Sequence, residues 1–374
     1  MKLNIALTLL TAAAVNADVG YTPVNDVTDH ARFGIDVKNI QKYIGDGNKT
    51  EAFELYSTYT EGVNSRASAG KTVQGMATKD WAAAVPEKKD FDKIKKAYEA
   101  VLGDNHLDSY TTDAINCDGT FDGYSEKLCE IAAKKNLHCT AISYSQYEGE
   151  KSIANSNEKN WDEMFAFWHG VYTEGADYFL DGGGAVVQGK RDKDFGTEYK
   201  KAALKALNDG QKAVQAPVDK EALQAAFDAF NAAHVGSFAQ ATMKYAKSMK
   251  DATEQSDIDK YFAEGYTYFR CAAGLFDADL ATFIQDQFDP RGVKAGSQPD
   301  VYCAIAKKMA ATSDIGYGVS INDLNLGFKL VNITTDCNIT LEAPSPSKPK
   351  PDSASGTFGY VAAAMSAFAV NLFL

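Results

Sequence analysis

The sequence predicts a mainly α-helical protein, built as a helical bundle. The segments from Asp90 to Gly103 and from Asp219 to His234 place apolar residues three and four apart, which is the spacing of one helix face. The segment from Thr197 to Val214 consists largely of strong helix formers. Alternating apolar and polar positions are scarce outside Gly318 to Thr334. We therefore expect helices throughout, with a hairpin at most near the C-terminal end.

The chain begins with the features of a secretion signal. Lys2 precedes an apolar run from Ile5 to Val15, and the small residues Val15 and Ala17 suit cleavage after Ala17. We expect residues 1–17 to be a signal peptide. A buried N-terminal helix is the alternative, but the run is short and has no amphipathic face.

The other end of the chain predicts a stalk and an anchor. Residues 343–357 are rich in Pro, Ser and Lys, with nothing to bury, which is typical of an extended linker. Residues 358–374 are uncharged and apolar. The small residues Ser353 to Gly356 before this tail resemble a glycosylphosphatidylinositol attachment signal, although the polar spacer is shorter than usual. A short membrane span is the alternative, and either would tether the protein to the outer face of the plasma membrane or in the periplasmic space.

Cysteines and glycosylation motifs agree with export. The six cysteines form no CxxC pair, so zinc binding and thiol exchange are disfavoured and three disulfides are expected. Cys303 and Cys337 could close a small C-terminal segment, but fifteen pairing schemes are open at this point. Sequons begin at Asn48, Asn332 and Asn338, as in a surface glycoprotein.

The remaining ectodomain, residues 18–342, is long enough for one large core or two smaller ones. The full sequence has a net charge of −12 at pH 7, and such an acidic surface repels nucleic acid. The motifs HExxH, GxSxG and the P-loop are absent, so we expect no enzymatic activity. The Gly-rich stretch from Asp181 to Asp192 has no preceding apolar strand, and it predicts a flexible connection.

A weak internal similarity suggests repeated amphipathic helical units. Trp161 to Gly170 aligns with Ile258 to Thr267, and Glu51 to Gly62 shares their aromatic-rich character. Such units suit a repeat-built bundle. Chance matching in a chain rich in Ala, Phe and Tyr is the alternative.

Five motifs follow one another between His30 and Ile284: HARFGIDVKNIQKYI, EAFELYSTYTEGVNS, WDEMFAFWHGVYTEGADYF, GKRDKDFGTEY and YFAEGYTYFRCAAGLFDADLATFI. In this order they resemble the low-iron-inducible periplasmic proteins of green algae, the iron-assimilating protein family to which the diatom phytotransferrins are related. The resemblance implies an extracellular, mostly helical protein that captures ferric iron (Fe³⁺) for uptake. In phytotransferrins it implies carbonate as a co-ligand. The resemblance ends near Pro299.

Ferric ion is small, hard and highly charged, and it prefers carboxylate and phenolate oxygens with an occasional imidazole. The two similar segments carry such residues at helical spacing, since His169 and Tyr172 lie three apart and Tyr266 aligns with His169. The metal-ligand candidates are Glu163, His169, Tyr172, Glu264, Tyr266 and Tyr268.

Arg191 and Arg270 are the candidates for holding the carbonate, because a guanidinium can donate two parallel hydrogen bonds to an oxyanion. Each candidate also has a plain structural interpretation. His169 and the tyrosines could be hydrogen-bonded core residues, and Arg191 could be solvated in a turn.

These observations leave two functions from different classes. The first is a cell-surface ferric-iron-binding protein that assists high-affinity uptake, handing its iron to a partner at the cell surface. The second is a coat or adhesion glycoprotein on the same scaffold without metal. A hydrolase with a clustered acid pair is a third and weaker possibility.

Overall fold

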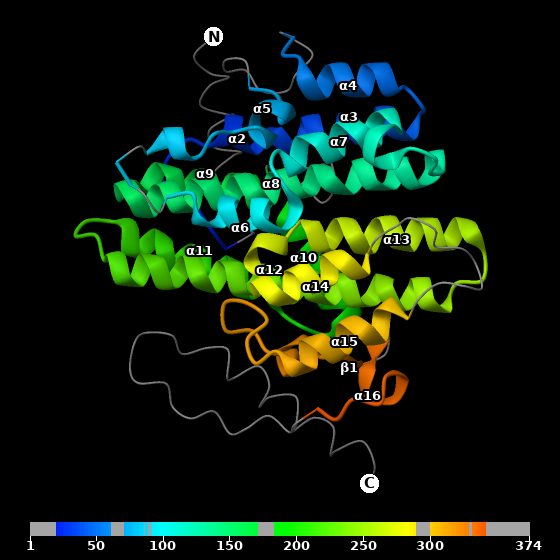
Figure 1. Cartoon of the computed structure of the whole chain (residues 1–374). Coiled ribbons are helices and arrows are strands. Elements are labelled where there is room, and N and C mark those ends of the chain that lie inside the picture. Colours follow the sequence, from blue (N-terminus) through cyan, green and yellow to red (C-terminus); the bar gives the residue numbers. More distant parts are fainter. Residues whose placement is uncertain are drawn as a thin grey trace.

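The computed structural model describes residues 20–60, 71–85, 87–88, 91–170, 183–288, 300–328 and 331–341. In these ranges the protein is mainly α-helical, which confirms the predicted fold class (Figure 1). The predicted signal peptide, stalk and anchor lie outside the described residues. Within those residues, no helix combines the length and apolar character needed to cross a membrane.

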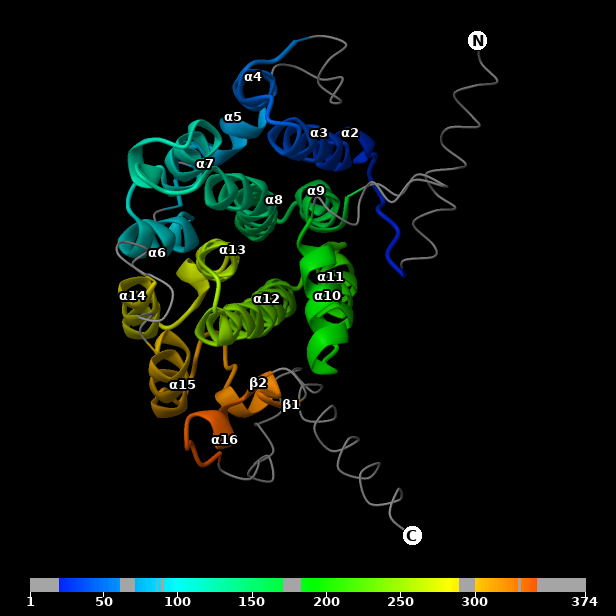
Figure 2. The same cartoon turned by 90° about the vertical axis from the view of Figure 1, so that its right-hand side faces the viewer.

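Helical hairpins that each join a long helix to a shorter one form the centre of the fold. One joins α8 (Glu126–Asn155) to α9 (Glu158–His169), and another joins α12 (Lys220–Asp251) to α13 (Gln255–Arg270). α13 packs against both α8 and α12, so the hairpins contact each other (Figure 2). The two similar sequence segments therefore occupy equivalent places, as the shorter helices α9 and α13.

Shorter helices surround this centre. On the side of α8 and α9 lie α2 (Thr28–Ala31), α3 (Phe33–Gly45), α4 (Lys49–Ser57), α5 (Val73–Ala77) and α7 (His106–Asn116). α6 (Lys93–Leu102) packs against α7 and against the turn Ala273–Leu275 that follows α13. Against α12 pack α10 (Gly184–Phe195), α11 (Tyr199–Val214) and α15 (Val301–Ala311). α14 (Ala278–Gln287) packs between α6 and α15, and α16 (Ile333–Asp336) contacts α15. Single 3-10 turns cover Ala82–Ala84, Gly119–Phe121, Ala273–Leu275 and Ile321–Leu324.

The helices predicted from apolar spacing are confirmed, although α12 continues past the predicted segment, from His234 to Asp251. α6 buries Ile94 and Tyr98, and it ends at Gly103, whose φ of 82° few other residues adopt. α12 begins after Asp219, whose side chain accepts a hydrogen bond from the Ala222 amide at 3.0 Å. Local capping chemistry therefore sets these boundaries.

The prediction of a flexible connection in the Gly-rich stretch is wrong, because α10 begins at Gly184 within it. The glycines there allow close packing on α9. A Cβ atom at Gly183 would lie 2.3 Å from the Trp168 carbonyl oxygen, and one at Gly184 would lie 2.9 Å from Trp168 Cδ1. The absence of a side chain at Gly183 and Gly184 therefore allows the close contact with Trp168, and it does not indicate a flexible chain.

The predicted C-terminal hairpin is much smaller than the alternating pattern suggested. β1 (Gly327–Phe328) pairs with β2 (Val331–Asn332) in antiparallel register, and each strand has two residues. Before them, Ser320 and Asp323 form a reciprocal capping box that directs the chain into a 3-10 turn. Local side-chain capping thus competes with strand formation.

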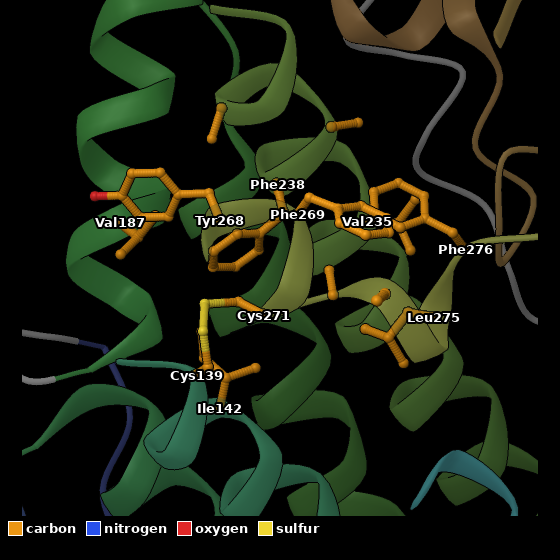
Figure 3. Close-up of a cluster of buried hydrophobic side chains, with 14 of the residues drawn as sticks. Cys139, Ile142, Val187, Val235, Phe238, Tyr268, Phe269, Cys271, Leu275 and Phe276 are labelled. Carbon is orange, nitrogen blue, oxygen red and sulfur yellow. A yellow bond between two sulfur atoms is a disulfide. The ribbon is translucent and has the colours of Figure 1, made fainter. Parts of the chain in front are cut away.

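All six cysteines lie in the described ranges and form three disulfides, Cys117–Cys129, Cys139–Cys271 and Cys303–Cys337. This confirms the predicted number and the disulfide-closed C-terminal segment. Cys139–Cys271 joins α8 to the residue after α13, within a cluster of buried apolar side chains (Figure 3). Three disulfides indicate an oxidising, extracellular type of compartment.

Removing the Cys139–Cys271 disulfide is expected to destabilise the fold more than removing Cys117–Cys129. The first pair is separated by 132 positions and the second by 12. In the chain-entropy relation, these loops correspond to about 5 and about 3 kcal/mol of unfolding free energy. Urea unfolding of the double variants Cys139→Ala/Cys271→Ala and Cys117→Ala/Cys129→Ala measures the difference. Equal losses would contradict the long-range role of Cys139–Cys271.

The substitution Gly210→Ala is expected to destabilise the protein by about 1–3 kcal/mol, because it overpacks a filled core. A Cβ atom at Gly210 would lie 1.9 Å from Cζ2 of the buried Trp161. Trp161 cannot retreat freely, since its indole nitrogen donates to the Leu207 carbonyl at 2.8 Å. Gly189→Ala is the control: its nearest neighbour is Lys200 Cδ at 3.4 Å, so thermal unfolding should show unchanged or higher stability.

Candidate functional site

A cavity of about 360 Å³ lies where α3, α8, α10 and α13 meet. Buried Ile131, Val186 and Val187 form an apolar part of its wall. Its other lining residues are polar or charged, and they are Gln41, Lys127, Lys134, Lys135, His138, Lys190, Lys260, Glu264 and Tyr268. Polar and charged groups thus converge beside a small apolar patch, and such a lining suits a charged ligand better than an apolar one.

The cavity has a positive lining in a protein with a net charge of −12. Lys127 and Lys134 each contact Glu130, at 2.9 and 2.7 Å, and the Lys135 ammonium lies 3.7 Å from a Glu264 carboxylate oxygen. The described lining residues include five lysines and one carboxylate, that of Glu264, so positive side chains predominate among them. The local charge is therefore opposite to that of the whole chain.

Tyr268 connects this cavity to a second aromatic side chain and a buried cation. Its ring stacks on Tyr245 of α12, with centroids 5.6 Å apart and planes at 19°. The guanidinium carbon of Arg191 on α10 lies 5.6 Å from the Tyr245 ring centre and 5.9 Å from that of Tyr268, within cation–π range. Figure 3 shows the Tyr268 ring near Val187, with its hydroxyl pointing away from the buried cluster. Two phenols and a guanidinium thus converge from three helices.

Neighbouring groups shift the pKa of the Tyr245 phenol in opposite directions. Burial, then the neighbouring Tyr268 and Glu264, raise the pKa of Tyr245, Arg191 lowers it, and the net result is a pKa of about 12. Burial alone would lower the pKa of the Arg191 guanidinium, but Tyr245, Tyr268 and Asp194 outweigh that effect and raise it. Arg191 therefore stays charged, and it favours the ionised form of any phenol beside it.

Arg191 has hydrogen-bonding capacity to spare. The residue is 5% exposed, and its Nη2 donates to Asp194 at 2.8 Å. Its buried Nε and Nη1 atoms have no hydrogen bond of normal geometry to any described residue, and the Tyr245 hydroxyl lies close to the guanidinium. Buried donors of this kind are rare, because leaving them unpaired costs about 1–3 kcal/mol each.

The cavity wall itself carries three kinds of metal-binding group. They are the Tyr268 phenol, the Glu264 carboxylate and the His138 imidazole, whose Nε2 lies 3.3 Å from Gln41 Nε2. Over the described ranges, no group of three or more His, Cys, Asp or Glu residues is arranged to hold a metal ion. A metal bound here would therefore depend on tyrosine oxygens, which suit a hard trivalent ion.

The sequence-predicted residues fall into separate places. Glu264 and Tyr268 line the cavity, and Arg191 contacts the Tyr268 ring. Tyr266 and Arg270 lie elsewhere and contact each other, with Arg270 Nη1 3.3 Å from the Tyr266 hydroxyl.

The surroundings of Tyr266 and Arg270 belong to α7 and α14. Gln285 donates to the Tyr266 hydroxyl at 2.8 Å, and Arg270 Nη2 donates to the His106 carbonyl at 2.6 Å. The Arg270 guanidinium also lies 4.1 Å from the Tyr110 ring centre. The structure thus gives both residues protein partners, away from the cavity.

Glu163 lies in a buried acid pair with Glu148 of α8. Asn160 donates to both carboxylates, at 2.8 Å to Glu148 and 3.3 Å to Glu163. His30 Nε2 lies 3.3 Å from Glu163, and Lys151 lies 3.4 Å from Glu148. Burial first, and then the neighbouring Glu163, raise the pKa of Glu148 to about 7. This pair joins α2, α8 and α9, and it does not line the cavity.

His169 is the last residue of α9, and it stacks on Phe165 with centroids 5.3 Å apart. Burial lowers the pKa of His169 to about 4, so its imidazole is neutral at neutral pH. Its Nδ1 lies 3.3 Å from the Gly170 carbonyl oxygen. Tyr172, the remaining candidate, lies outside the described residues.

Sequence reasoning missed Tyr245, His138 and the lysines of the cavity. A local signal existed for the lysines, because Lys127 and Lys134 are seven apart and so lie on one face of α8. No local signal marks Tyr245, which meets Tyr268 only through the packing of α12 on α13.

Comparison with known proteins adds no assignment: no family model, no curated protein and no solved structure matches this chain. The resemblance of its ordered motifs to the iron-assimilating family is therefore an interpretation of the sequence. The cavity and the residues around Tyr268 are the features of the described structure that bear on function.

Replacing Glu148 by Gln is expected to raise stability relative to the wild type as the pH increases. The Glu148 pKa is raised to about 7 in the folded protein, so between its ordinary range and pH 7 the folded state holds a proton that the unfolded chain has lost. The wild type should lose about 3 kcal/mol of unfolding free energy across this window, whereas Gln cannot titrate.

Urea unfolding of both proteins at pH 5, 6 and 8 measures this difference. Glu198→Gln is the control, because the Glu198 side chain is 50% exposed and pairs with Lys201 at the surface. A wild-type-to-variant difference that does not change with pH would contradict the assignment.

Proposed function

We propose that the protein is a non-catalytic, extracellular ferric-iron-binding protein that assists iron uptake at the cell surface, with carbonate or a similar oxyanion completing the metal site. The observation that carries this proposal is the convergence of Tyr245, Tyr268 and Glu264 beside Arg191. The two phenols and the carboxylate supply oxygen ligands of the kind that a trivalent cation prefers. The guanidinium can hold the accompanying anion.

The cation and the proton compete for the phenols. Burial holds the Tyr245 pKa at about 12, so its hydroxyl keeps its proton near neutral pH in the metal-free protein. Binding of Fe³⁺ would displace that proton, because a nearby trivalent charge strongly favours the phenolate. The binding of iron should therefore release protons and weaken in acid.

Arg191 supplies the second half of the proposed site. Its Nε and Nη1 atoms carry hydrogen-bond donors on different edges of the guanidinium, and either one could donate to a bound oxyanion such as carbonate. A bound anion would also offset the cost of their burial, and it would add two oxygen ligands to the metal. His138 is the cavity's candidate for an imidazole ligand.

Two features support the proposed location, namely the disulfides and the two ends of the chain. Three disulfides indicate an oxidising compartment, and we propose that residues 1–17 direct export and the C-terminal tail supplies a lipid anchor. Asn48 and Asn338 are exposed, so both sequons are accessible to glycosylation. The coat or adhesion glycoprotein shares these features and differs in lacking metal.

Titration of the purified protein with ferric iron at pH 8, in the presence of bicarbonate, is expected to produce a visible phenolate-to-iron charge-transfer band. Tyr268→Phe and Tyr245→Phe should each weaken binding by about tenfold or more, since each removes an anionic ligand. Lowering the pH to 5 should release the iron, because carbonate and phenolates take up protons.

Tyr266→Phe is the matched control, because Tyr266 lies on the same helix but its hydroxyl accepts from Gln285. This variant should keep the band and the affinity. Equal binding at both pH values and with or without bicarbonate, or no band at all, would refute the iron site and favour the coat glycoprotein.

A further inference from the structure

The lysines of the cavity have no role in binding a bare metal ion. Lys127, Lys134 and Lys135 come from α8, Lys190 from α10 and Lys260 from α13. Positive side chains repel a trivalent cation, so a lysine-rich entrance is unfavourable for free Fe³⁺. The same lining attracts anions in a protein whose acidic surface otherwise repels them.

The positive charges are spread rather than concentrated at one point. Lys127 and Lys134 are seven residues apart on α8, which corresponds to a rise of about 10 Å along the helix. Lys190 and Lys260 approach the cavity from other helices. A single compact anion cannot contact all of these groups, whereas an anion with several separated acidic groups can.

The apolar part of the wall indicates the rest of the ligand. Ile131, Val186 and Val187 are buried side chains that line the same cavity as the lysines. Carbon atoms of an organic acid can pack on them, while an inorganic oxyanion has no apolar surface to offer. A volume of about 360 Å³ exceeds the needs of carbonate and lies in the range of small-molecule sites.

We propose that this cavity binds a small organic polycarboxylate, with the acid groups on the lysines and the carbon skeleton on Ile131, Val186 and Val187. A second step rests on the proposed function. If the protein binds iron, the iron would arrive in this cavity as an anionic polycarboxylate complex. The lysines attract that complex, and Tyr268 and Glu264 lie on the same wall, where they can complete the coordination of its metal.

Calorimetric titration of the metal-free protein with citrate at neutral pH tests the binding step without iron. We expect citrate to bind, to bind more weakly at high salt because exposed charges are screened, and to bind more tightly than inorganic phosphate. Lys190→Gln and Lys135→Gln should each weaken citrate binding by about tenfold. Lys190 is exposed, so its replacement leaves the fold intact.

Lys205→Gln is the matched control, because Lys205 is a surface lysine of α11 that pairs with Asp209 and does not line the cavity. It should leave citrate binding unchanged. Absence of citrate binding, equal effects of all three variants, or phosphate binding as tight as citrate would overturn the proposal. None of these outcomes involves iron, so they leave the test of the iron site independent.

The arrival of iron as a polycarboxylate complex is tested by a separate measurement. After loading with ferric citrate, isotopically labelled citrate should stay with the protein through gel filtration in proportion to the bound iron. Iron retained without labelled citrate would overturn the anionic-cargo inference while leaving the iron site standing. Labelled citrate retained without iron would support the cavity and count against the proposed function.

Discussion

The position of α13 between α8 and α12 is the constraint on which the rest of the structure depends. α13 packs against both long helices, and the Cys139–Cys271 disulfide joins its end covalently to α8. Because the last part of the helix, from Gly265 to Arg270, is buried, the polar residues there must find partners inside the protein. Tyr266 and Arg270 find partners on α7 and α14, whereas Tyr268 meets Tyr245, Arg191 and the cavity. One helix thus supplies a structural polar cluster on one face and the candidate site on another.

Charge separates the cavity from the rest of the molecule. The chain is acidic as a whole, and many of its surface lysines pair with acids on the same helix, as Lys205 does with Asp209. Among the described residues that line the cavity, lysines from α8, α10 and α13 outnumber carboxylates. Such a lining is electrostatically more favourable for small anions than the acidic chain as a whole. The Glu148–Glu163 pair shows the opposite case, in which burial and, next, a neighbouring like charge favour protonation of Glu148.

The helical elements were predictable because their signals are local. Apolar residues three and four apart predicted α6 and α12, and Gly103 and Asp219 marked an end and a start that the structure confirms. The Gly-rich stretch in which α10 begins gave the wrong prediction of a flexible connection. Gly183 and Gly184 allow a close contact with Trp168, which no local pattern reveals. The candidate site was only partly predictable for a related reason. Tyr266 and Tyr268 are two apart, and side chains at that spacing do not share a helix face.

Taken alone, the sequence determined the helical character, the number of disulfides and the identity of the acidic, phenolic and cationic groups, because these follow from composition and short-range spacing. The choice of partners was decided by the tertiary structure. Tyr245 stacks on Tyr268, and Arg191 lies against both, through the packing of α10, α12 and α13. The three residues are far apart along the chain, and long-range contacts of this kind depend on how whole helices pack. For that reason the pairing of donors in space could not be read from any one segment.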